Sequence, residues 1–297
     1  MKVGSYDDDS FVDPWIKDVK QRHSYELLLK AQVQSVGLGR KKASGIDTGV
    51  PCIVVYVFPK LPRSALSPRD VVPTAVEDVL TDVIEMRPPE ARVRTSSPLR
   101  EPERAKRWRP APAGVSVGHY QLKGAGTLGA WIRGKTGEYL LMSCWHVLTN
   151  YGKGRRGDPI LQPALADGGS VEKDTIAWLD RWTDVRMLGP NLGEAKSNLK
   201  ALLDLGKTPP VNYVDVAFAK PISQEVVSNE ILGLGASPIS QFGQERTEIR
   251  IPQLDEDIVK SGRTTGVTRG KICAVDLNIF VGYPTGIALF LDCDAVT

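Results

Sequence analysis

Long apolar runs are missing from this sequence of 297 residues. No stretch approaches the roughly 18 to 20 apolar residues that a membrane-spanning helix needs. The first ten residues contain three consecutive aspartates and no apolar core of the kind found in secretory signals. We therefore expect no membrane partner and no secretion.

Cysteines are few and widely spaced. Cys52, Cys144, Cys273 and Cys293 form no Cys-x-x-Cys pair and no paired spacing. This pattern argues against a disulfide framework and against a zinc site, so we expect free thiols in a reducing cytoplasm and no metal.

A strong charge imbalance is also missing. Lys and Arg number 38 against 35 Asp and Glu, a formal net charge of +3, so bulk charge predicts no nucleic-acid partner. With 41% hydrophobic and 25% charged residues, the composition is that of an ordinary globular protein. The length predicts about two domains.

The first part of the chain predicts one helix and several strands. Asp and Pro at positions 13 and 14 can cap a helix that we expect to run to about Val33. Residues 35–42 and 52–59 read as strands separated by a glycine-containing turn, and a short helical piece and a strand should end near Met86. Residues 1–86 are therefore predicted to form a small α/β domain.

Residues 87–113 are rich in proline and arginine and poor in apolar residues, which predicts a solvated linker. From residue 114 to 297 the sequence consists of short apolar runs separated by Gly, Asn, Asp and Pro. This pattern favours an all-β barrel or sandwich. A long loop over 189–212 should hold a short helix at 194–205.

Residues 129–136 match the spacing of a phosphate-binding P-loop, and an apolar run ending at Asp292 resembles the aspartate of a magnesium site. A P-loop needs a helix immediately after its lysine, so that backbone amides can cradle phosphate. Here Gly137 and another apolar run follow, which predicts a strand hairpin instead.

Residues 114–118 match the Gly-x-Ser-x-Gly nucleophile elbow around Ser116. The elbow is followed by an aspartate and then a histidine later in the chain. No aspartate lies between Ser116 and His146, and no histidine follows His146, so chain order excludes this arrangement.

His146 and Asp215 are the candidate catalytic residues. Of the three histidines, His23 falls on a predicted helix among polar neighbours, and His119 falls in a predicted edge strand. His146 follows an apolar run, where we expect it at the end of a strand. Asp215 stands between two valines at the start of another apolar run, where a carboxylate needs a partner.

Three segments carry a resemblance to trypsin-like serine peptidases. Residues 140–148 resemble the segment around their catalytic histidine, and residues 212–221 resemble the segment that supplies the aspartate. The stretch from Lys260 resembles an element of the subgroup that contains the plant narrow-leaf 1 proteins and bacterial relatives. The resemblance spans about residues 33–297.

This resemblance implies an α+β protein in which a trypsin-like double β-barrel over residues 114–297 follows the N-terminal domain. It implies hydrolysis of a peptide or protein substrate without a cofactor, with His146 as general base and Asp215 as its orienting partner.

The Gly-Asp-Ser-Gly motif that carries the nucleophile in that family is not in the sequence. We expect it to follow residues 287–297, so that the second barrel is incomplete and the serine is supplied beyond Thr297 or by another chain. The strand over 286–294 should then have an open edge that self-associates or binds a partner chain. The rival hypothesis is a non-catalytic pseudo-peptidase that acts as a protein-binding module.

Other hydroxyl and thiol groups are not expected to replace the nucleophile. Cys144 is expected to be a buried, inert thiol, although the spacing could put it on the same side of a strand as His146. Ser261, Thr264 and Thr265 lie in a glycine-rich segment typical of a turn.

We predict that these 297 residues alone do not turn over a serine-peptidase substrate. The resemblance implies that both the nucleophile and the oxyanion-binding amides are absent, so no serine should react with a fluorophosphonate probe. Mass spectrometry of the probe-treated chain checks this, and modification of a single serine would contradict it.

Overall fold

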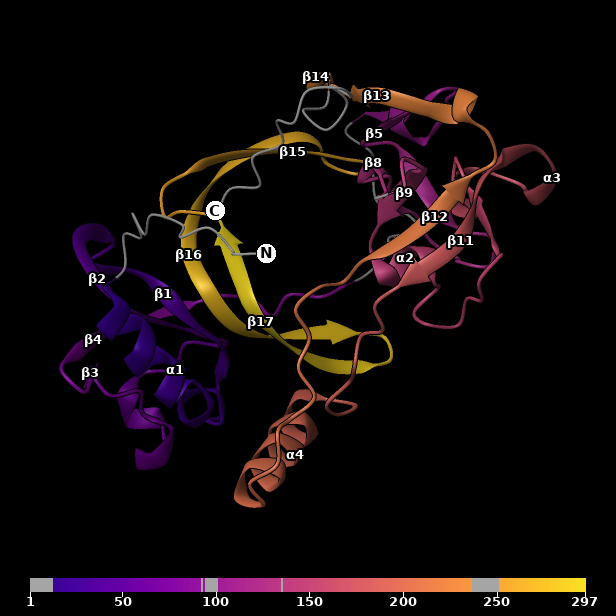
Figure 1. Ribbon diagram of the computed structural model, residues 1–297. Helices are drawn as coiled ribbons and strands as arrows, with labels where there is room; N and C mark the ends of the chain where they lie inside the picture. The colour runs from indigo at the N-terminus through magenta and orange to yellow at the C-terminus, as the bar shows by residue number, and fades with distance from the viewer. Residues whose placement is uncertain (1–12, 92, 94–100, 135, 237–250) are drawn as a thin grey trace.

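The computed structural model describes residues 13–91, 93, 101–134, 136–236 and 251–297, and its chain is mostly β with few helices (Figure 1). The predicted α+β class is thus confirmed in part: the chain contains both helices and strands, and strands predominate. Within the described residues, no helix is both long and apolar enough to cross a membrane.

The first sheet has seven strands and curls into a half-barrel (Figure 1). The strands follow the order β15-β16-β1-β2-β4-β3, and β17 pairs with β16. Their bounds are β1 (Val33–Ala43), β2 (Ile46–Val57), β3 (Ala75–Val76), β4 (Val79–Glu85), β15 (Asp257–Gly262), β16 (Gly266–Tyr283) and β17 (Gly286–Val296).

The apolar half of β2 is buried on both faces. Ile53, Val55 and Val57 point into a core with α1 (Pro14–Leu28), while Cys52 and Tyr56 on the opposite face pack against residues of β16. Because side chains alternate between the two faces of a strand, a continuous apolar run is what a strand covered on both sides requires.

Helix α1 begins as its sequence predicts and ends earlier. The Asp13 side chain accepts a hydrogen bond from the Trp15 amide at 2.8 Å, and Pro14 occupies the first turn. The helix stops at Leu28 rather than near Val33, which instead begins β1. The predicted end is wrong because strand pairing of Val33 with Val57 prevails over the apolar periodicity.

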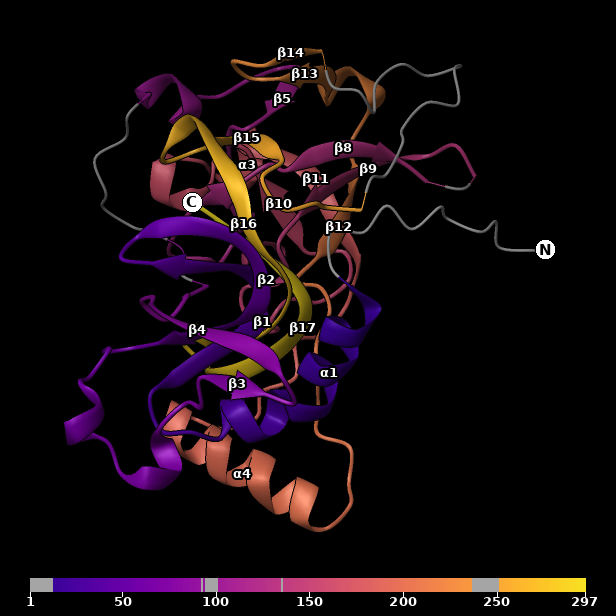
Figure 2. The same ribbon diagram turned by 90° about the vertical axis from the view of Figure 1, so that its left-hand side faces the viewer.

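A second sheet of seven strands follows the order β7-β6-β10-β11-β12-β9-β8, and a smaller sheet follows β14-β13-β5. The bounds in these sheets are β5 (Ala111–Ala113), β6 (Ser116–His119), β7 (Gly126–Thr127), β8 (Ala130–Arg133), β9 (Tyr139–Ser143), β10 (Pro159–Leu161), β11 (Thr175–Trp182), β12 (Ala217–Pro221), β13 (Val227–Ile231) and β14 (Gly235–Ala236). The remaining helices are α2 (Trp145–Leu148), α3 (Val171–Asp174) and α4 (Leu192–Asp204), with 3-10 turns η1 (Arg63–Ala65), η2 (Pro68–Asp70), η3 (Pro102–Ala105), η4 (Leu165–Asp167) and η5 (Gln224–Val226). Helix α4 matches the helix expected at 194–205, and it lies below the first sheet near α1 (Figure 2).

The first sheet joins the two ends of the chain. In the antiparallel pairing of β1 with β16, Ser35 faces Ile279 and Gly39 faces Ala274. One buried core contains side chains of α1, β1, β2, α4, β16 and β17. The predicted domain boundaries at residues 86 and 114 stay a prediction, but strands from both sides of them share this sheet and this core.

The two alternative motifs have structural roles. Residues 130–133 and 139–143 form the β8–β9 hairpin, so a strand occupies the supposed P-loop, as predicted. Ser116 is fully buried in β6, and its hydroxyl accepts a hydrogen bond from the Ala164 amide at 3.0 Å. Among the residues of these two segments that the structure describes, none forms a phosphate cradle or an exposed nucleophile.

The outer edge of β17 is partly covered, which corrects the expectation of unpaired amides there. The Ile287 amide donates to the Gly189 carbonyl at 2.7 Å, and the Leu291 amide donates to the Asn212 carbonyl at 2.9 Å. The segments that flank α4 thus pair with this edge, as a following strand would. Self-association through the rest of the edge stays a prediction.

We predict that Leu289→Ala lowers the free energy of unfolding by about 2 to 5 kcal/mol, because Leu289 is fully buried in the core shared by both chain ends. Amide hydrogen exchange should also accelerate in β1, far away in sequence. Ile251→Ala, at an exposed position, is the control and should change stability by less than about 0.5 kcal/mol. Unchanged exchange in β1 would show that the two chain ends unfold independently.

Candidate active site

His146 lies on the single-turn helix α2 (Trp145–Leu148), directly after β9. The expected position at the end of a strand is wrong in detail, because β9 stops at Ser143 and the chain turns at Cys144. Cys144 and His146 are consequently not on one face of a strand. The side chain of His146 retains 12% exposure, so it is packed but still reaches solvent.

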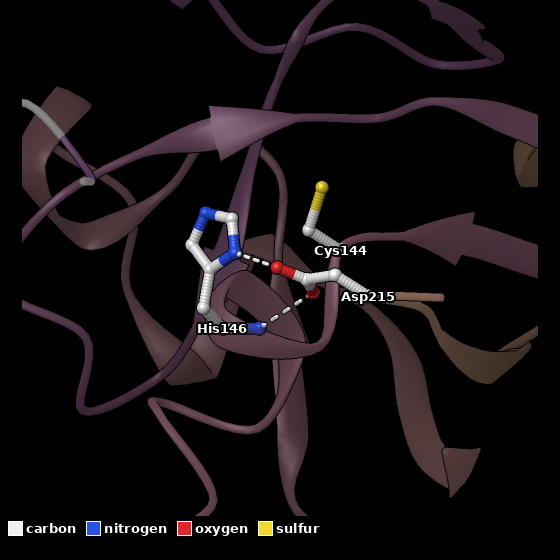
Figure 3. A group of neighbouring side chains, drawn as sticks. All are labelled: Cys144, His146 and Asp215. Atoms are coloured by element: carbon white, nitrogen blue, oxygen red, sulfur yellow. Dashed lines mark hydrogen bonds and ion pairs between the residues drawn. The ribbon is translucent and has the colours of Figure 1, made fainter. Parts of the chain in front are cut away.

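Asp215 lies two residues before β12, in irregular backbone rather than at the strand start that was expected. Strand β12 pairs with β9 through Ala217 and Ser143, and this register places Asp215 beside His146. The His146 Nδ1 atom is 2.7 Å from Asp215 Oδ2, and the His146 amide lies 3.4 Å from Oδ1 (Figure 3). The predicted proximity of the two residues is confirmed, while their catalytic role stays a prediction.

The hydrogen bond defines the tautomer of the imidazole. An ionised carboxylate can only accept, so in the neutral imidazole Nδ1 of His146 carries the proton and Nε2 has the lone pair. Figure 3 shows that the second ring nitrogen points away from the carboxylate. Burial raises the pKa of Asp215, but the hydrogen bond and charge of His146, with the Tyr283 hydroxyl, outweigh it and hold the pKa below its usual value.

Tyr283, at the end of β16, is a third member of the site that sequence reasoning missed. Its hydroxyl donates to Asp215 Oδ2 at 2.9 Å, and its ring lies edge-on to the ring of His146. Burial and the nearby Asp215 charge raise the pKa of Tyr283, so the hydroxyl stays protonated and able to donate. No local motif marks this residue, because its partner Asp215 comes from a distant segment of the chain.

An aromatic shell surrounds the imidazole. The Tyr151 ring stacks on the His146 ring, with centroids 5.8 Å apart and planes inclined by 28°. Trp145 lies edge-on to Tyr283, with centroids 6.0 Å apart. These rings restrict the orientation of the imidazole, and among the described residues no serine hydroxyl bonds to its Nε2 atom.

Cys144 is exposed, contrary to the expectation of a buried thiol. It lies at the N-terminal end of α2, and its sulfur lies near the imidazole and the carboxylate (Figure 3). Desolvation by neighbouring atoms and the charge of Asp215 raise the pKa of its thiol to about 12, even though the residue reaches solvent. The free thiol is therefore protonated at neutral pH and is not an activated nucleophile.

The other candidate residues serve structural roles. His119 is in β6, paired on both sides rather than at an edge, and is fully buried, with Nε2 3.0 Å from Asp158 Oδ2. His23 lies on α1 beside Glu77. Ser261 donates to the Leu232 carbonyl at 2.7 Å, and Thr265 accepts from the side chain of Lys260, in the preceding strand β15, at 2.8 Å.

Comparisons with known proteins give little beyond this geometry. No protein-family model matches the chain, and no curated protein matches it. A search of solved structures finds the crystal structure of Nocardiopsis protease (NAPase), at 16% sequence identity and a TM-score of 0.35. That match covers 62% of this chain and 70% of the Nocardiopsis chain. A likeness this distant carries no argument about activity.

We predict that Tyr283→Phe lowers the free energy of unfolding at pH 7 by about 1 to 3 kcal/mol, because a buried carboxylate loses a hydrogen bond. The folded pKa of Asp215 lies below its usual value of 3.8, so the stabilisation from its hydrogen bonds is complete above pH 3.8 and is lost as the pH falls through the folded pKa. The difference in free energy of unfolding between wild type and Tyr283→Phe should therefore shrink below pH 3.8.

Denaturant titrations across this pH range measure the effect. Tyr151→Phe is the matched control, because the Tyr151 hydroxyl accepts from the Val93 amide and does not bond to Asp215. It should retain the wild-type pH dependence. An equal pH dependence in Tyr283→Phe and wild type would contradict the role assigned to Tyr283.

Proposed function

We propose that His146 and Asp215 are the base and the orienting carboxylate of a trypsin-like serine endopeptidase. The observation that carries the proposal is the 2.7 Å contact between His146 Nδ1 and Asp215 Oδ2, with the second ring nitrogen left for a substrate-side partner. The order of these residues in the chain and the segments around them, which resemble those of trypsin-like peptidases, support the same assignment.

The geometry supports one sequence of proton transfers. Nε2 of His146 accepts the proton of a serine hydroxyl as its oxygen attacks the peptide carbonyl. The imidazolium that forms is stabilised by Asp215, whose carboxylate is held by the Tyr283 hydroxyl. The imidazolium then protonates the leaving amine, and water hydrolyses the acyl-enzyme by the same base.

Solvent access distinguishes this pair from the second histidine–aspartate pair. The His119 side chain has no exposure, and its Nε2 atom is already bonded to Asp158. The His146 side chain retains some exposure and bonds to its carboxylate through Nδ1. A general base must reach its substrate, so His146 is the candidate and His119 is not.

The nucleophile is proposed to come from outside the described residues. A serine at Nε2 needs no metal or organic cofactor in this mechanism, and its substrate is a peptide or protein. We place the activity in the cytoplasm, because all four cysteines are free.

We predict that the product of the whole open reading frame, read to its stop codon, reacts with a fluorophosphonate at one serine. His146→Ala should lower kcat by about 10³-fold or more, and Asp215→Asn should lower it by about 10⁴-fold, because the imidazole is lost or adopts the wrong tautomer. Labelling rates and hydrolysis of fluorogenic peptides measure both effects.

His23→Gln is the control, because His23 lies on α1 and bonds to surface carboxylates. It should leave labelling unchanged. If no serine is labelled, or if labelling persists in His146→Ala, the peptidase proposal fails and the protein-binding module is the better account.

A further inference from the structure

Three different metal-ligating side chains meet at the candidate active site. Cys144, His146 and Asp215 each offer a ligand atom, and these atoms all lie within 4.8 Å of one another (Figure 3). The set comes from two segments of the chain, the β9–α2 junction and the approach to β12. The expectation of no zinc site rested on the spacing of the cysteines in the sequence. That spacing does not reveal that these three side chains lie together in the fold.

We propose that this cluster is a divalent zinc site, with the Cys144 sulfur, the His146 Nδ1 atom and one Asp215 oxygen as ligands. Thiolate, imidazole and carboxylate together favour zinc over calcium or magnesium, which prefer oxygen alone. Three protein ligands also leave a fourth tetrahedral position for water.

The required movements are small. In a tetrahedral zinc site the nitrogen and oxygen ligands lie roughly 3.4 Å apart, and sulfur lies roughly 3.6 Å from nitrogen. Nδ1 and Oδ2 are now 2.7 Å apart, so they need to separate by less than about 1 Å. The sulfur lies within 4.8 Å of the other two ligand atoms, so it needs to approach them by at most about 1.2 Å.

The surroundings already orient the ligands. The Tyr283 hydroxyl donates to Asp215 Oδ2 at 2.9 Å, as outer hydrogen bonds do for metal-bound carboxylates. The buried pair His119 and Asp158 provides a natural contrast, because within the described chain it is not part of any such three-ligand group.

Metal binding has a chemical consequence for the imidazole. Coordination at Nδ1 displaces the proton from that atom, and a neutral imidazole then carries its proton on Nε2. The Cys144 thiol releases a proton, so the two anionic ligands balance the charge of the cation. With Nε2 protonated, His146 cannot accept a proton. This inhibitory effect rests on the proposed function, whereas the metal site does not.

The test uses Co²⁺ as a spectroscopic substitute for zinc on the 297-residue chain. Wild type should bind one Co²⁺ with a thiolate-to-cobalt charge-transfer band, and one equivalent of Zn²⁺ should abolish the band. Cys144→Ala should lose the band and bind on the order of 100-fold more weakly. Tyr283→Phe should bind about 10-fold more weakly, because the carboxylate loses its outer partner.

Two controls make the outcome decisive. Cys273→Ala removes a thiol that lies beside Tyr56, away from the cluster, and should keep the band. On addition of Zn²⁺, the NMR signals of the His146 ring should shift while those of His119 stay in place. Circular dichroism checks that Cys144→Ala is folded.

Three results would overturn the proposal, whether or not the protein is a peptidase. They are absence of the band in wild type, its persistence in Cys144→Ala, and a shift of the His119 signals in place of those of His146.

Discussion

The Asp215 carboxylate is bonded by donors from both sides of the junction between the two main sheets of the molecule. It accepts hydrogen bonds from the ring and backbone of His146 on the second sheet's side and from Tyr283 on the first sheet. A largely buried charge without these donors would destabilise the fold strongly. The ionised carboxylate therefore requires that the two sheets stay in contact, because each side supplies part of its donors.

Apolar packing reinforces the same junction. Trp145, next to His146, packs with Tyr283 and Phe290 of the first sheet and with Val185 of the loop after β11. The orientation of the imidazole therefore depends on residues at the C-terminal end of the chain. The proposed base and the proposed zinc ligands use one set of atoms, and the position of the proton on His146 distinguishes the two states.

Sequence reasoning predicted the parts of this site that local patterns encode. The apolar runs before His146 and around Asp215 marked the two residues, and capping by Asp13 and Pro14 marked the start of α1. Sequence reasoning failed where the position of a side chain depends on pairing between segments that are far apart in the chain. The place of Tyr283 beside Asp215 depends on how the end of β16 packs, and Cys144 is exposed at the turn between β9 and α2; no pattern within one segment predicted either.

The pairing of β1 with β16 has a consequence for synthesis of the protein on the ribosome. Strand β1 ends at Ala43, but its partner begins at Gly266, so one edge of β1 cannot be paired until the more than 200 residues between them have been made. At roughly 5 to 20 residues per second, that edge stays open for tens of seconds. Contacts so distant in sequence also slow folding after release. The nascent chain is thus most exposed to wrong strand pairing, and to chaperones, before β16 emerges.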